Sequence, residues 1–449
     1  MTTPVRKQEP GKRTANFDEV CLGYNKEEAA AEASRCLQCK EPSCVSGCPA
    51  NIDIPAFVKA VKEGKNDDAI SIIRRTNSLP GVCGRVCPQE TQCEEKCILH
   101  KKGSPIAIGK LERFAADNAK EQKPPKIKKS RKKAAVVGSG PASLACAADL
   151  ALKGYEVEMF EALHKLGGVL QYGIPSFRLP RKVLNAEVNY IKKLGVKVVR
   201  NCVVGKTISL AELSGNYDAV FLGTGAGLPR FMNILGEDLC NVYSANEFLV
   251  RVNLMKAHKF PEYRTPVKKG SKVVVVGGGN VAIDAARVAK RMGADVTIVY
   301  RRSFEEMPAR IEEIRHAQEE GIEFLMLTNP VRILGEGCVS GVECIQMRLG
   351  GEDETGRKSP IPIEGTEFTI ECDQFIVAIG QTPNPLLWKS SNLVVGGRGV
   401  VVNESLQTSI PNVFAGGDAI SGSATVINAI GDGKKAAEKI EEFLNGKSD

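Results

Sequence analysis

The sequence predicts an α/β protein in which a helical, cysteine-rich segment precedes two Rossmann-like dinucleotide-binding domains, one inserted in the other. Eight of the 15 cysteines lie from Cys36 to Cys97. Residues 132–161 and 272–302 share one pattern: a buried strand, a glycine-rich turn, a helix and a second strand. Two strand-like runs that end alike, 217–225 and 372–380, flank the second unit. Such runs are expected where a chain leaves one domain and returns to it after an insertion.

The composition limits the classes of protein to consider. The chain has 449 residues, of which 43% are hydrophobic and 25% charged, as in globular proteins of two or three domains. It has no run of 18 apolar residues that would predict a membrane span, and its N-terminus lacks the apolar core of a secretory signal. We therefore expect a cytoplasmic protein, in which the cysteines serve metal or redox chemistry rather than disulfides.

The first 120 residues are expected to be helical, with the cysteines on connecting loops. Asn25 and Glu28 have the capping-box spacing at the start of one helix. Pro55 and Gly64 mark the two ends of another. Signals for β-strands are few in this part of the chain.

Changes in sequence pattern predict three domains and a linker. The predicted parts are a helical domain at 1–120, a basic linker at 121–133, a first dinucleotide-binding domain at 134–228 and 373–449, and an inserted domain at 229–372. Much of the net charge of +8 lies between Lys123 and Lys133. We interpret this run as a solvated linker; the alternative is a docking patch for an acidic partner such as ferredoxin. No aromatic residues interleave with its charges, which argues against nucleic-acid binding.

The clustered cysteines form two quartets with short spacings. They read Cys36-x2-Cys39-x4-Cys44-x3-Cys48-Pro49 and Cys83-x3-Cys87-Pro88-x4-Cys93-x3-Cys97. Thiolates on short loops are typical ligands of 4Fe-4S clusters, and in a similar ferredoxin motif the cysteine before proline binds the other cluster. We therefore expect two interleaved iron–sulfur clusters. Zinc is the alternative, but zinc ribbons use paired C-x2-C motifs, and only one is present.

The first glycine turn predicts a site for FAD or NAD. Gly138 allows a tight turn, and Gly140 allows a pyrophosphate to approach the N-terminus of the following helix. The third position of the motif is Ser143, a small departure that could loosen helix–sheet packing. Glu161 ends the second strand, where a carboxylate accepts hydrogen bonds from a ribose 2′-hydroxyl and repels a 2′-phosphate. The turn residues expected to contact the cofactor are Gly138, Gly140, Pro141 and Ala142.

The second glycine turn predicts a site for NADP(H). It has the same pattern, and Ala282 is an accepted third residue of the motif. The strand that follows ends in Arg301 and Arg302 instead of an acid, and two guanidinium groups can hold a 2′-phosphate. The alternative is that both arginines are simply solvated. The residues expected to contact this cofactor are Gly277, Gly279, Asn280 and Val281, together with the two arginines.

Five longer motifs resemble one family, the small (beta) subunit of NADPH-dependent glutamate synthase. They are Arg35-Cys-Leu-Gln-Cys39, Gly84-Arg-Val-Cys-Pro-Gln89, Ile108-Gly-Lys-Leu-Glu-Arg-Phe114, Gly168-Val-Leu-Gln-Tyr-Gly-Ile-Pro175 and Val413-Phe-Ala-Gly-Gly-Asp418. The resemblance covers nearly the whole chain. The large subunit of electron-bifurcating NADH-dependent ferredoxin:NADP⁺ oxidoreductase and the N-terminal half of dihydropyrimidine dehydrogenase are similar to the same family.

The resemblance implies a ligand set for each cluster. The cluster nearer solvent would use Cys36, Cys39, Cys44 and Cys97. The cluster nearer FAD would use Cys48, Cys87, Cys93 and Glu112, which leaves Cys83 without a metal. The resemblance also implies an FAD cavity lined by Gly168, Gly417, Asp418, Thr425 and Val426.

Together these features predict an NADPH-dependent oxidoreductase subunit with FAD and two 4Fe-4S clusters. NADPH would reduce FAD, and electrons would leave through the clusters to a partner redox subunit, which is the large subunit if the chain is a glutamate synthase small subunit. In the alternative, the chain is the large subunit of a bifurcating enzyme or a sulfide dehydrogenase, and its partner is a small flavin and iron–sulfur subunit. A non-catalytic electron relay is a third hypothesis. Hydride transfer needs no side-chain acid or base, so no catalytic residue is predicted.

Overall fold

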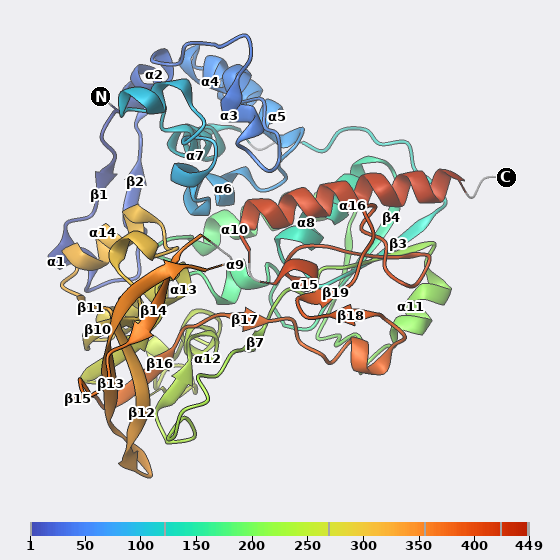
Figure 1. The fold of residues 1–449 in the computed structure, drawn as a ribbon. Helices are drawn as coiled ribbons and strands as arrows, with labels where there is room; N and C mark the ends of the chain where they lie inside the picture. The colour runs from blue at the N-terminus through green and yellow to red at the C-terminus, as the bar shows by residue number, and fades with distance from the viewer. Residues whose placement is uncertain (1, 121–122, 268–269, 354–355, 423, 447–449) are drawn as a thin grey trace.

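The computed structural model describes residues 2–120, 123–267, 270–353, 356–422 and 424–446. Figure 1 shows a helical domain, in blue and cyan, above two α/β domains that lie side by side. Among the described residues, no helix combines the length and the apolarity that crossing a membrane requires.

The N-terminal domain is helical, as predicted. Its helices are α2 (Lys26–Ser34), α3 (Ser43–Ser46), α4 (Ile54–Lys62), α5 (Asn66–Arg74), α6 (Pro80–Val86) and α7 (Ile108–Asn118). Asn25 caps α2 with a capping box that includes Glu28, and Pro55 lies in the first turn of α4. A segment before α2 contains α1 (Pro10–Arg13) and the short antiparallel pair of β1 (Arg6–Lys7) and β2 (Cys21–Gly23). This segment reaches down to the inserted domain (Figure 1).

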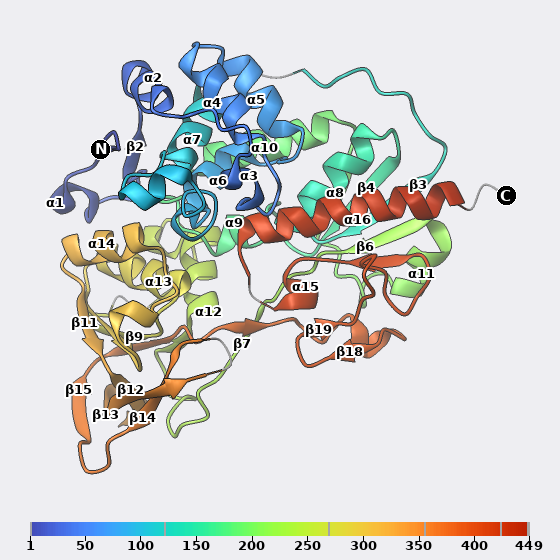
Figure 2. The ribbon, with the colours of Figure 1, turned by 45° about the horizontal axis from the view of Figure 1, so that its top comes forward.

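The first α/β domain contains a parallel sheet with the strand order β20-β6-β3-β4-β5. Its strands are β3 (Lys133–Val137), β4 (Glu156–Glu161), β5 (Lys197–Arg200), β6 (Ala219–Leu222) and β20 (Val413–Ala415). Its helices are α8 (Pro141–Leu152), α9 (Val169–Tyr172), α10 (Arg181–Lys193), α11 (Leu210–Asn216), α15 (Asp418–Ser421) and α16 (Val426–Gly446). The long helix α16 lies along α8 in both views (Figures 1 and 2). Gly433 makes this contact close, because a Cβ there would lie 2.1 Å from the carbonyl oxygen of Ala142.

The second α/β domain contains another parallel sheet, in the order β11-β10-β9-β16-β8. Its strands are β8 (Val242–Ser244), β9 (Lys272–Val276), β10 (Asp295–Tyr300), β11 (Glu323–Met326) and β16 (Gln374–Val377). Its helices are α12 (Ala245–Leu249), α13 (Asn280–Arg291) and α14 (Ile311–Glu319). Both sheets are thus built as the two glycine-turn patterns predict.

One predicted boundary is wrong. We expected the first domain to resume at residue 373, but β16 follows this point and pairs with both β9 and β8 inside the second sheet. The chain crosses back after β16, where β17 (Gln381–Thr382) pairs with β7 (Leu228–Pro229), so the two crossings run antiparallel to each other. The sequence of a buried four-residue strand does not show which of the two sheets it joins. Only its hydrogen-bonded neighbours identify the sheet.

An antiparallel β-ribbon extends from the second sheet and was not predicted. It consists of β12 (Thr328–Glu336), β13 (Cys338–Glu352), β14 (Lys358–Pro362) and β15 (Phe368–Glu371). Two short strands, β18 (Val395–Gly396) and β19 (Gly399–Val400), form a hairpin before the chain re-enters the first sheet. In the predicted linker, 121–122 lie outside the described residues, and 123–132 contain no helix or strand.

A buried network of ion pairs joins the N-terminal segment to the second domain. The Arg13 side chain is 1% exposed, and its Nε lies 2.8 Å from Glu320. Arg287 and Arg291 of α13 pair with the same carboxylate, both at 2.7 Å. Burial alone would raise the pKa of Glu320, but hydrogen bonds from Arg291 and Arg287 outweigh it and lower the pKa to about 2. The network therefore depends on an ionised Glu320.

Candidate nucleotide and iron–sulfur sites

The first glycine turn leaves one open position at the N-terminus of α8. Gly138 has φ +90°, and a Cβ there would lie 2.5 Å from the carbonyl oxygen of Gly223. Gly140 instead has φ −70°, and no protein atom lies within 4 Å of the point where its Cβ would be. Gly138 is thus required by the fold, whereas Gly140 keeps space free beside helix amides that favour an anion.

Ser143 strengthens the contact that its presence in the motif could have loosened. It is fully buried, and its hydroxyl lies 3.3 Å from the carbonyl oxygens of both Val137 and Gly223. These carbonyls belong to the ends of β3 and β6. The hydroxyl therefore ties α8 to two strands of the sheet.

Glu161 lies buried at the end of β4, next to the first turn. Its carboxylate accepts hydrogen bonds from the Ser139 hydroxyl and from the Leu163 amide, the latter at 2.8 Å. The Ser139 hydroxyl also accepts a hydrogen bond from Gly167 N at 3.0 Å. Glu161 thus connects the glycine turn with the loop before α9.

Two other parts of the chain converge on this turn. Gly168, at φ +52°, lies so close that its Cβ would be 2.9 Å from Gly140 Cα. Gly417, at φ +66°, lies against Ala142, with a Cβ-to-Cβ distance of 3.0 Å if it carried one. Asp418 follows it and accepts a hydrogen bond from the Ala424 amide at 3.0 Å. Burial raises the pKa of Asp418 to about 6.

The beginning of α16 completes this surface. Thr425 Oγ1 accepts a hydrogen bond from Asn428 N at 3.3 Å, and Val426 is the first residue of the helix. Asp432, which lies further along the same helix, accepts a hydrogen bond from Gly417 N at 2.9 Å. The structure thereby brings together the residues predicted around the first cofactor, and it adds Asp432, which no local motif marks.

The second glycine turn repeats the geometry of the first. Gly277 has φ +139°, and a Cβ would lie 2.4 Å from the Ala378 carbonyl oxygen. Gly279 has φ −92° and open space around the position of its Cβ. Asn280 begins α13 and accepts a hydrogen bond from Arg310 N at 3.1 Å. Val281 is 42% exposed beside it. This turn also leaves space where a pyrophosphate would approach.

The two arginines after β10 have different environments. Arg302 is buried; its Nη2 lies 2.6 Å from Asp353, and its Nε donates to the Lys358 carbonyl at 2.8 Å. Its guanidinium therefore anchors the β13–β14 hairpin rather than standing free for a phosphate. Arg301 is exposed. The structure thus distinguishes Arg301 from Arg302, although the sequence alone predicts the same phosphate-binding role for both.

Four cysteines from distant positions surround one cavity. Cys36, Cys39, Cys44 and Cys97 line this cavity together with apolar residues such as Leu37 and Ile54. Burial, together with the nearby Cys97, Cys36 and Cys39, raises the pKa of Cys44 to about 12. The cavity is lined by three cysteines of the first quartet and one of the second, so the two quartets interleave.

A second set lies deeper, against α7. Burial raises the pKa of Cys93, with added contributions from the neighbouring Glu94, Cys48, Cys87 and Glu112. Glu112 is 5% exposed, and burial raises its pKa to about 8. Its Oε1 accepts a hydrogen bond from Asn77 Nδ2 at 2.8 Å.

Cys83 is also near this set. It is fully buried, and its thiol donates to Asn77 Oδ1 at 3.7 Å. Within the described ranges, no three His, Cys, Asp or Glu side chains converge tightly enough to bind a single metal ion.

The deeper set lies beside the first nucleotide cradle. A Cβ on Gly431 of α16 would lie 3.0 Å from the carbonyl oxygen of Pro49, the residue after Cys48. The apolar cores of the two domains are continuous, since Phe57 and Leu111 share one cluster with Ala142 and Ile430. The helical domain is thus packed directly against the first α/β domain.

Comparisons with known proteins match this arrangement. Residues 13–124 match the family described as dihydropyrimidine dehydrogenase domain II, 4Fe-4S cluster, and residues 132–433 match the pyridine nucleotide-disulphide oxidoreductases. The small chain of NADPH glutamate synthase from Escherichia coli K12 is 36% identical over 96% of this chain and 95% of its own length. The chain belongs to the family of the glutamate synthase small chains. It is an oxidoreductase whose cofactors are iron–sulfur clusters, FAD and NADPH.

Other similar proteins are longer than this chain or share only its fold. The beta subunit of NADP⁺-dependent formate dehydrogenase from Moorella thermoacetica is 40% identical over 89% of this chain, which spans 60% of that subunit's length. FprA from Mycobacterium tuberculosis in complex with NADPH has a TM-score of 0.60 at 21% identity, over 71% of this chain and 85% of FprA. Both the formate dehydrogenase subunit and the glutamate synthase small chain are named as parts of complexes.

Proposed function

We propose that the chain oxidises NADPH at the second glycine turn, holds FAD at the first, and passes electrons through two 4Fe-4S clusters to a partner redox subunit. One observation carries this proposal: each turn contains a glycine that the fold requires and a glycine that leaves open space at a helix N-terminus. Two such cradles in one chain fit two dinucleotides. The cysteine-lined cavity lies in the domain packed against the first cradle.

The residues around the first turn fit FAD. Gly140 and the amides of α8 would receive the pyrophosphate, and Glu161 would accept a ribose hydroxyl. Gly168, Gly417 and Asp418 would line the remaining cavity, with the beginning of α16 beside the ring system. When bound, FAD accepts a hydride and releases electrons singly. The protein binds and orients it.

Arg301 is the residue that supports NADPH at the second turn. It is exposed at the end of β10, the strand whose terminal residue contacts the ribose in this fold. Arg302 contributes by fixing the β13–β14 hairpin through Asp353. We therefore assign recognition of the 2′-phosphate to Arg301 and assign Arg302 a supporting role.

Two sets of ligands are proposed for the clusters. The outer set is Cys36, Cys39, Cys44 and Cys97, which share one cavity. The inner set is Cys48, Cys87, Cys93 and Glu112. For the inner set, the support is that Cys48, Cys87 and Glu112 lie close enough to Cys93 to raise the pKa of its thiol. Cys83 and Glu112 both hydrogen-bond to Asn77, and we leave Cys83 outside both sets because the family resemblance assigns it no metal. The many thiols suit a reducing compartment, and we propose the cytoplasm.

The identity of the partner distinguishes two candidate functions. As a glutamate synthase small chain, the protein would supply electrons to a large amidotransferase subunit. The 40% identity to the formate dehydrogenase beta subunit, against 36% for the Escherichia coli small chain, favours a second candidate, an NADP-linked subunit of a different redox complex. Isolation of the native complex tests both. A large amidotransferase supports the first candidate, and a formate-oxidising or other flavin and iron–sulfur subunit supports the second.

A further inference from the structure

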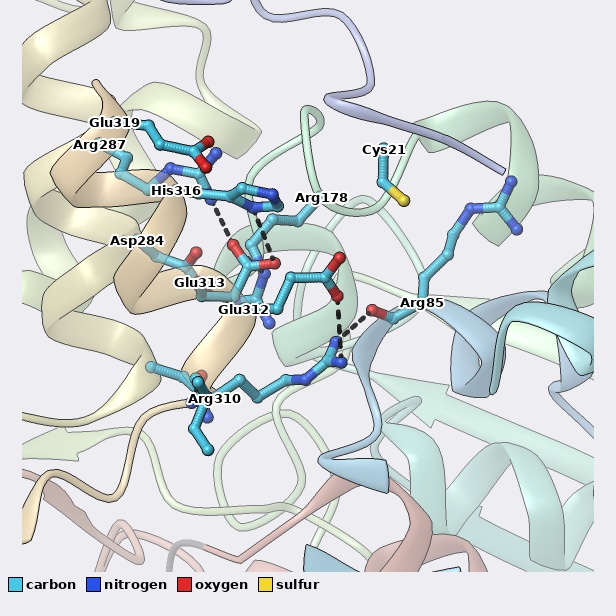
Figure 3. Close-up of polar contacts among 12 residues, drawn as sticks. Cys21, Arg85, Arg178, Asp284, Arg287, Arg310, Glu312, Glu313, His316 and Glu319 are labelled. Atoms are coloured by element: carbon cyan, nitrogen blue, oxygen red, sulfur yellow. Dashed lines mark hydrogen bonds and ion pairs between the residues drawn. The ribbon is translucent and has the colours of Figure 1, made fainter. Parts of the chain in front are cut away.

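Arg310 lies where the inserted domain meets the helical domain. Its side chain is 5% exposed and comes from the residue just before α14. Nη1 donates to the Arg85 carbonyl at 3.0 Å, and Nη2 donates to Gln89 Oε1 at 2.9 Å. Nε lies 3.3 Å from Glu90. Figure 3 shows the guanidinium reaching across the boundary to the Arg85 carbonyl. One side chain of the inserted domain thus holds the loop that follows Cys87.

Two backbone amides, those of Arg310 and the preceding Ala309, donate hydrogen bonds to the second glycine turn. Arg310 N donates to Asn280 Oδ1 at 3.1 Å, and Ala309 N donates to Gly278 O at 3.2 Å. Asn280 is the first residue of α13, where the pyrophosphate of the nucleotide is proposed to bind. A bound nucleotide would therefore contact a residue that is hydrogen-bonded directly to Arg310.

The far end of this connection is tightly packed. Gln89 Nε2 donates to the Cys83 carbonyl at 3.2 Å, and a Cβ on Gly109 would lie only 2.2 Å from that nitrogen. Glu90 accepts a hydrogen bond from Ile311 N at 3.2 Å, at the start of α14. Because close-packed groups transmit displacements instead of absorbing them, a shift of the second turn must move this loop.

We propose that Arg310 is a positioning residue that links occupancy of the second nucleotide site to the conformation of the loop 87–93. The inference rests on the proposed function, which supplies both the nucleotide site and the cluster ligands in this loop. The coupling is reciprocal: NADP⁺ alters the loop, and the state of the loop alters the affinity for NADP⁺ by the same factor. Through this link, filling the nucleotide site would change the surroundings of the proposed inner-cluster ligands Cys87 and Cys93.

Hydrogen–deuterium exchange on the anaerobic holoprotein tests this coupling. Peptides within 84–97 are compared with and without saturating NADP⁺, and nucleotide binding is measured separately by calorimetry. We expect NADP⁺ to change amide exchange there about fivefold or more, the lower end of usual coupling between sites. In Arg310→Gln, we expect NADP⁺ still to bind but its effect on these peptides to disappear. Arg332→Gln is the matched control, because Arg332 pairs with Glu343 on the exposed ribbon.

The outcomes separate coupling from a merely structural role. If Arg310 only held the domains together, Arg310→Gln would raise exchange in 84–97 and leave the NADP⁺ effect intact, which would overturn the proposal. Gln89→Leu removes the other partner of the contact and tests the same point if Arg310→Gln does not fold. Wild-type protein that binds NADP⁺ without any change in these peptides would overturn the coupling alone. Wild-type protein that binds no NADP⁺ would overturn the nucleotide site, and the coupling with it.

Discussion

Replacing the open glycine of each cradle with alanine should weaken the binding of one cofactor and leave the fold intact. Gly140→Ala adds a methyl group where no protein atom lies within 4 Å, at an ordinary φ of −70°. The loss of a preferred N-cap residue and the reduced entropy of the unfolded chain offset each other, so the free energy of unfolding of FAD-free protein should change by less than about 1 kcal/mol. The same methyl occupies the space for the pyrophosphate, so FAD affinity should fall at least about tenfold, or about 1.4 kcal/mol.

Two further substitutions make this test selective. Gly279→Ala should weaken NADPH binding by a similar factor and leave the FAD content unchanged. Gly138→Ala should destabilise the protein itself, since it places a Cβ 2.5 Å from the Gly223 carbonyl and costs about 1–2 kcal/mol for left-handed backbone before that clash is counted. FAD per chain, nucleotide affinity and urea unfolding are measured for each variant. Full FAD affinity in Gly140→Ala would refute the assignment of the first cradle.

Three other predictions follow from single contacts. Arg301→Ala should reduce the preference for NADPH over NADH at least about tenfold in steady-state dye reduction. Arg302→Ala should keep this preference and lower the melting temperature. Equal effects of the two substitutions on the preference would contradict their separate roles. The lowered pKa of Glu320 contributes about 3 kcal/mol well above pH 4.5, which is lost as the pH falls toward 2. The wild type should therefore lose about 1 kcal/mol more of its unfolding free energy between pH 6 and 4 than Glu320→Gln does, measured by urea titration. Cys83→Ser should retain the full iron and sulfide content, while Cys44→Ser should lose part of both.

The parts of the fold that depend on short patterns were predictable from sequence. The tight turn at Gly138 needs positive φ, and Gly140, two residues further on, needs space beside it, so both demands appear as glycines at fixed spacing. The interleaving of the cysteines followed partly from the Cys48-Pro49 pair and otherwise from family resemblance. For the glycine turn and the Cys48-Pro49 pair the signal lies in neighbouring residues, so it can be recognised in the sequence.

The parts that depend on distant contacts were not predictable. Arg302 is held by Asp353, and this pairing exists only because the β13–β14 hairpin folds back on β10. β16 belongs to the second sheet because of its hydrogen-bonded neighbours, not its composition. Asp432 and Arg310 likewise stand in ordinary helical or loop sequence. Asp432 bonds to Gly417, which precedes its helix, and the Arg310 guanidinium bonds to Arg85 and Gln89 of the helical domain, so no local signal could reveal either contact.

The proposed electron path from NADPH through FAD to the clusters is tested by anaerobic titration of the purified protein with NADPH, in which flavin absorbance and the signals of the iron–sulfur clusters are followed together. We expect NADPH to bleach the flavin and the clusters then to accept electrons, and we expect NADH to do so far less well. Protein that contains FAD, iron and sulfide but shows no flavin bleaching with NADPH would contradict it.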